Sequence, residues 1–188
     1  MSLRIPSLLG FLFLVGCSDA PNAQLPSTDV QSSSDTPSSA EPQSSSWRVT
    51  AEGVGPVEFG MSADEFVALG GSAGIPRDPE YCVYGVLPAA PQPMRFMIES
   101  GTVVRVDVDS TGTATAEGAR VGDTEGSIQE LYRGRVTVQP HKYTDGHYLI
   151  VPLQNDSTRA LVFETDGKRV TRYRAGLVPQ VHYVEGCS

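Results

Sequence analysis

The chain has 188 residues, enough for one ordinary domain with additional segments, and 39% of them are hydrophobic, enough for one modest core. Its formal net charge is −8, from 14 basic and 22 acidic residues. Nucleic-acid binding needs clustered Lys and Arg to meet the phosphates, so this acidity argues against a nucleic-acid partner.

Residues 1–16 predict a lipoprotein signal peptide. Arg4 is the only charge before an apolar run from about Leu8 to Val15. The run is shorter than the about 20 residues that a membrane span needs, and its pattern is typical of a secretory signal. It ends in LVGC, which resembles the lipobox of bacterial lipoproteins. The resemblance implies that Cys17 is lipid-modified and becomes the first mature residue; an ordinary signal peptide with a chance cysteine is the alternative.

Residues 17–46 predict a disordered tether that starts at the lipidated cysteine. Residues 18–46 contain ten Ser, four Pro and no Lys or Arg. Such a segment buries too little apolar surface to offset its ordering entropy. Ser18, rather than Asp, follows the cysteine, which in Gram-negative lipoproteins favours the outer membrane. The resemblance therefore implies a lipid-anchored envelope protein on the outer membrane, facing the periplasm.

Residues 47–188 predict one globular domain with two helical segments. The first is MSADEFVALGG, Met61 to Gly71, where Ser62 and Glu65 form a capping box and Phe66 and Leu69 share a face. The second is GDTEGSIQELYRG, residues 122–134, which superposes on the first at an offset of 62.

Hairpin signals follow each helical segment, with two-residue turns at Ser100-Gly101 and Asp166-Gly167. These turns pair Met97 with Val104 and Phe163 with Val170. The same alternation places on the solvent side the charged residues Arg105, Asp107 and Asp109. We therefore predict an α+β fold, with small helices packed on an antiparallel sheet as two tandem helix-then-strands repeats, about 47–112 and 113–188. Chance similarity of short stretches is the alternative.

The first helical segment carries a family resemblance. FGMSADEFVALGG, with Pro76 just beyond, resembles the signature of the SmpA/OmlA family, which includes the outer-membrane assembly lipoprotein BamE. The tandem arrangement resembles β-lactamase inhibitor protein, which doubles a similar unit. The resemblance implies an α/β sandwich with one open sheet face, and protein–protein binding rather than catalysis.

The cysteines beyond Cys17 form an even pair. Cys82 and Cys187 would lie in an oxidising compartment, so we predict a structural disulfide between them. A redox-active thiol pair usually shows CxxC spacing, which is absent here.

The sequence shows no constellation typical of catalysis or metal binding. Two histidines lie in PHKYTDGHY, but a turn at Asp145-Gly146 points His141 and His147 to opposite faces, and His182 is remote in sequence. The chain lacks GxSxG, SxxK and a phosphate loop. We therefore expect no metal, no cofactor and no enzymatic activity.

The basic stretch KRVTRYRAG supplies the candidate binding residues. Arg172 and Arg174 share the parity of Val170 and, with Tyr173, are candidates to engage an acidic partner. A solvated strand end, or pairing with acids of the first half, is the alternative. Together these patterns predict a non-enzymatic lipoprotein that binds or helps to assemble another envelope protein. The alternatives are an inhibitor of a secreted or periplasmic hydrolase and a small-ligand binder.

Overall fold

A computed structural model of the chain describes residues 47–74, 81–91 and 93–187. The predicted signal peptide, Cys17, the predicted tether and Pro76 lie outside the described residues. Within the described ranges, no helix is both long enough and apolar enough to cross a membrane.

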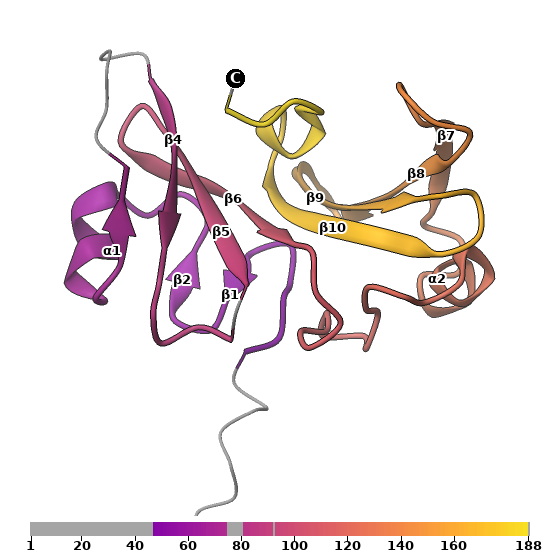
Figure 1. Cartoon of the computed structure of the whole chain (residues 1–188), viewed down its shortest axis with the longest axis horizontal. Coiled ribbons are helices and arrows are strands. Elements are labelled where there is room, and N and C mark those ends of the chain that lie inside the picture. The colour runs from indigo at the N-terminus through magenta and orange to yellow at the C-terminus, as the bar shows by residue number, and fades with distance from the viewer. Residues whose placement is uncertain (1–46, 75–80, 92, 188) are drawn as a thin grey trace, which may run out of the picture. The chain divides into compact units, whose positions relative to one another are not determined.

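The domain is built on one antiparallel sheet of eight strands in the order β3-β4-β5-β6-β10-β9-β8-β7 (Figure 1). The strands are β3 (Ser72–Ala73), β4 (Cys82–Val86), β5 (Met94–Glu99), β6 (Thr102–Val108), β7 (Thr137–Pro140), β8 (His147–Leu153), β9 (Asp156–Thr165) and β10 (Val170–Leu177). A separate two-stranded sheet joins β1 (Gly53–Val54) to β2 (Val57–Glu58). The two halves of the chain meet in the middle of the large sheet, where β6 pairs with β10.

The predicted α+β class, with small helices packed on a sheet, is wrong: the structure is mostly β, with only about 12% helix. The helices are α1 (Ala63–Ala68), α2 (Glu125–Leu131) and the 3-10 helix η2 (Gln180–His182). α1 and α2 have 6 and 7 residues, and each buries a single side chain, Phe66 and Ile128. Leu69, which was expected on the buried face beside Phe66, is exposed, and so is Leu131 at the equivalent position of α2. Helices this short cannot form a layer, so strand side chains supply most of the core.

The capping box that starts α1 is present as predicted: the Ser62 side chain accepts from the Glu65 amide, and the Glu65 carboxylate accepts from the Ser62 amide. In element order, a helix followed by four strands occurs twice. The division into repeat halves at 47–112 and 113–188 stays a prediction.

The main hydrophobic core packs against one side of the large sheet, here named the core face. It contains inward side chains of β5, β6, β9 and β10 together with Phe66 and Tyr132. The ring centroids of Phe163 lie 5.6 Å from those of Tyr132 and 5.5 Å from those of Tyr173. Because side chains alternate along a strand, the residues between these core positions point to the opposite side, here named the polar face.

The register departs from the prediction in both hairpins. The turn at Ser100-Gly101 is present, with both φ angles positive, but Met97 pairs with Arg105 rather than Val104. A β-bulge next to Met97 inserts one extra residue and shifts the pairing.

In the second hairpin, Val170 pairs with Thr165, and Phe163 pairs with Tyr173 instead of Val170. A second irregularity lies between Val170 and Arg172. It breaks the expected parity, so Val170 joins the core while Arg172 lies on the polar face.

Candidate functional site

The polar face carries charged residues in register across three central strands. Arg95 of β5 is opposite Asp107 of β6, which is opposite Arg174 of β10. In the neighbouring row, Arg172 of β10 is opposite Glu164 of β9. The sheet therefore presents alternating positive and negative groups at its centre.

Glu164 is the centre of a buried ion cluster. Glu164 and Arg174 are each only 3% exposed, and Arg174 Nη1 donates to Glu164 Oε1. The other carboxylate oxygen lies 3.0 Å from Arg172 Nε and 3.6 Å from His141 Nε2. Charges removed from water to this degree need partners, and here the two arginine partners lie on the adjacent strand β10.

Arg105 forms a second buried pair on the same face. Its Nε lies 3.1 Å from Asp107 Oδ2 and its Nη2 lies 2.9 Å from Asp107 Oδ1, so both carboxylate oxygens are engaged. Nη1 donates to the carbonyls of Gln180 and Tyr183, at 3.0 and 2.8 Å, and Nη2 donates to the Tyr84 hydroxyl at 3.1 Å. The expectation of solvent-exposed Arg105 and Asp107 is therefore wrong: they leave the core face as predicted but are buried under another part of the chain.

That covering part is residues 178–187, here named the C-terminal segment. Its Val181 packs with Tyr148, Ala160 and Val162 in a small apolar cluster on the polar face. Arg174 Nε donates to the Val181 carbonyl at 2.5 Å. The two buried arginines of the sheet thus hold the segment through its backbone carbonyls.

A disulfide fixes the end of the C-terminal segment to the sheet. It joins Cys82 in β4 to Cys187, with their Cα atoms 5.2 Å apart. Gly186 has φ +69°, and a Cβ there would lie 2.4 Å from the Tyr84 hydroxyl. Glycine lets the backbone pass directly over this tyrosine.

The three candidate binding residues have different fates. Arg172 lies on the polar face with 54% of its side chain exposed. Arg174 lies beside it but is buried. Tyr173 is fully buried on the core face, its hydroxyl has no hydrogen-bond partner among the described residues, and burial raises its pKa. Of these three residues, Arg172 alone is accessible to a partner.

A hollow of about 280 Å³, here named the arginine hollow, opens between the C-terminal segment and the sheet. The side chains around it include Tyr84, Arg95, Arg105, Arg172, Arg174 and Glu185. Sequence reasoning missed Arg95 and Tyr84, which come from strands distant in the chain. Alternation along β4 and β5 could have placed Tyr84 and Arg95 on the polar face. No local sequence pattern shows that the C-terminal segment covers this face and closes the hollow.

The histidines contact different elements. His141 stacks on Tyr148, with ring centroids 4.6 Å apart, whereas His147 Nδ1 lies 2.8 Å from Glu125 Oε1 of α2. Across residues 47–74, 81–91 and 93–187, no group of three or more His, Cys, Asp and Glu side chains is arranged to hold a metal ion.

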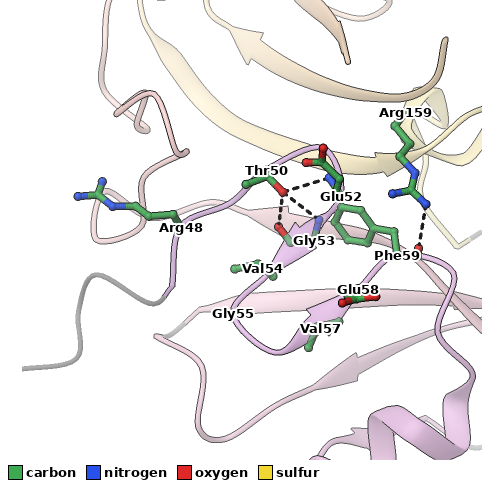
Figure 2. A pocket seen from close by; sticks show the side chains of 10 residues that line it. All are labelled: Arg48, Thr50, Glu52, Gly53, Val54, Gly55, Val57, Glu58, Phe59 and Arg159. Atoms are coloured by element: carbon green, nitrogen blue, oxygen red, sulfur yellow. Dashed lines mark hydrogen bonds between the residues drawn. The ribbon is translucent and has the colours of Figure 1, made fainter. Parts of the chain in front are cut away.

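A larger hollow of about 440 Å³ lies beside the β1–β2 hairpin (Figure 2). Thr50 Oγ1 there accepts from the amides of Glu52 and Gly53, both at 3.1 Å. Arg159 Nη2 donates to the Phe59 carbonyl at 3.5 Å. Figure 2 shows the Arg48 side chain extending away from the other side chains drawn. The Thr50 contacts thus hold the turn at residues 50–53 together, and the Arg159 contact joins β9 to the residue that follows β2.

Guanidinium groups define the chemistry of the arginine hollow. A guanidinium group carries several N–H donors in a planar fork and no acceptor, so it binds and orients anions. No protein family, no curated protein and no solved structure matches the chain. The resemblance to the SmpA/OmlA family stays a prediction.

Proposed function

We propose that the protein is a non-enzymatic lipoprotein of the cell envelope that binds another envelope protein through its polar face. A lipid on Cys17 anchors it to the outer membrane, facing the periplasm, and residues 18–46 tether the domain. The lipobox LVGC and the Ser-rich composition of the tether support the anchoring.

The observation that carries the binding proposal is a set of exposed Arg and Tyr side chains on the polar face. Arg172, Tyr143 and Tyr183 are all exposed to a substantial degree. Tyr183 belongs to the C-terminal segment, and the Tyr143 hydroxyl donates to Glu185 of the same segment. Arg and Tyr are enriched in protein–protein interfaces and in their energetic hot spots.

The fixed backbone of the C-terminal segment adds to this argument. Arg105, Arg174 and the disulfide hold the segment at separate points. A surface ordered before binding loses less conformational entropy when the partner arrives.

Inhibition of a secreted or periplasmic hydrolase is the second candidate. The disulfide-held segment favours it, because inhibitor complexes typically use surfaces that change little on binding. Inhibition assays with the mature chain carrying Cys17→Ala test this candidate. Inhibition of a hydrolase by this chain, and no inhibition when Arg172→Glu is added, would support it.

Chemical cross-linking in intact envelopes tests the first candidate. We expect one adduct of defined mass with the wild-type protein and its loss with Arg172→Glu. Arg133→Glu is the matched control, because Arg133 is an exposed arginine on the residues following α2. Failure to form any adduct in repeated experiments, or an adduct equally lost in the control, would contradict the proposal.

A further inference from the structure

We propose that the arginine hollow is a carboxylate-binding site that receives an acidic side chain of the partner protein. This inference rests on the proposed function and specifies the chemistry of the partner, which must present an exposed acidic segment.

The buried cations of the hollow already have their own anions. Arg105 is bonded to Asp107 through both carboxylate oxygens, and Arg174 is bonded to Glu164. Neither buried guanidinium therefore supplies a surplus positive charge. Their contribution is to fix the floor of the hollow and the carbonyls of the C-terminal segment.

Glu185, on the rim, is also engaged. Its carboxylate lies 2.6 Å from Lys142 Nζ and accepts from the Tyr143 hydroxyl. The Lys142 and Tyr143 contacts hold the pKa of Glu185 at about 2, so this group remains a paired anion at neutral pH. It therefore does not satisfy the arginines on the other side of the hollow.

Arg172 carries the surplus charge. Its Nε lies 3.0 Å from Glu164 Oε2, but that carboxylate also faces Arg174, so one negative charge meets two positive ones. Arg172 is more than half exposed, whereas Glu164 and Arg174 are buried. An incoming carboxylate can reach Arg172 from solvent and balance the cluster.

Arg95 supplies a second exposed cation on the opposite wall. It lies on β5, in the row of Asp107 and Arg174, whereas Arg172 lies two residues away along β10, so the Cα atoms of the two exposed arginines are about 12 Å apart. The Arg95 guanidinium lies over the Tyr84 ring, 5.1 Å from its centroid, and its Nη2 lies 4.0 Å from Asp109 Oδ2. Both side chains line the hollow, so both guanidinium groups can reach a carboxylate placed between them, and each such contact is a charge-assisted hydrogen bond.

The test is an NMR titration of the mature chain carrying Cys17→Ala with a capped hexaglutamate peptide. We expect saturable shifts of amides around Arg95 and Arg172, weakened by salt, and no shifts with capped hexaglutamine. Arg172→Gln should weaken binding about tenfold or more, because it removes a charge-assisted contact. Arg95→Gln provides a second variant, and Arg133→Gln is the control that should bind like the wild type.

Three results would overturn the inference: no saturable shift with hexaglutamate, equal weakening by Arg133→Gln, or binding of free glutarate or phosphate as tight as that of the peptide. The last would identify a site for a small anion. Envelope cross-linking separates this test from the proposed function. An adduct without peptide binding overturns the carboxylate site alone, whereas peptide binding without any adduct overturns the proposed function.

Discussion

Replacement of Glu164 by Gln tests the buried ion cluster of the polar face. The substitution keeps the side-chain volume but removes the negative charge that faces Arg174, and both residues are only 3% exposed. Removing one partner of a buried pair costs about 3–5 kcal/mol, because the other charge is left buried and unpaired. Arg174 keeps its bond to the Val181 carbonyl, so we expect the lower end, about 3 kcal/mol.

Urea unfolding of the mature chain at neutral pH measures this loss. With a slope of about 2 kcal/mol per molar, the midpoint should fall by about 1.5 M. Glu130→Gln is the control, because Glu130 forms an exposed pair with Arg133, and it should leave the midpoint unchanged. The double variant Glu164→Gln with Arg174→Met removes the unpaired charge and should recover part of the stability.

A loss below about 1 kcal/mol for Glu164→Gln would refute this account of the cluster, since that is the range of exposed pairs. The account would also be refuted if adding Arg174→Met to Glu164→Gln lowered the free energy of unfolding further, by as much as an independent substitution of a buried residue. In that case Arg174 would act through its contact with Val181 rather than through Glu164.

Three further predictions concern the C-terminal segment and the anchor. Replacing Cys82 and Cys187 together by Ser opens a loop with a sequence separation of 105 and should lower the free energy of unfolding by up to about 4.7 kcal/mol in chemical denaturation. Burial first, and the positive charge of Arg174 second, lower the pKa of His182. The free energy of unfolding should therefore fall as the pH drops from about 6.5, the pKa of an unperturbed histidine, to the lowered pKa of His182 in the folded protein. Unfolding of His182→Asn, measured as a function of pH, should lack this decrease. Cys17→Ala should move an otherwise folded protein from the membrane to the soluble fraction, and membrane retention of that variant would contradict the anchor.

Local signals in the sequence predicted local structure well. The Ser62–Glu65 capping box and the Ser100-Gly101 turn each depend on residues at most three apart, and both are present. The helix that follows the cap was misjudged in its role, because sequence spacing shows which side chains share a face but not how many find a buried contact. Leu69 shares a face with Phe66 by spacing, yet it is exposed.

The errors in the candidate site come from bulges and from a distant covering segment. The irregularity between Val170 and Arg172 places these two residues on opposite faces, although they were expected on the same face. No pattern of residues in the sequence predicts this irregularity. Arg105 is buried only because residues more than 70 positions later pass over it and accept its hydrogen bonds. Such burial is decided by tertiary contacts, which alternation along one strand cannot show.

Site-specific photo-cross-linking in intact envelopes tests most directly the central claim that the polar face binds the partner. A photoreactive residue replaces Tyr143, whose hydroxyl contacts Glu185 at the arginine hollow, and in a second variant it replaces the exposed Leu131 of α2. We predict an adduct of one defined mass from position 143, absent from position 131 and lost with Arg172→Glu. The same adducts from both positions, or an adduct from position 131 alone, would contradict the claim.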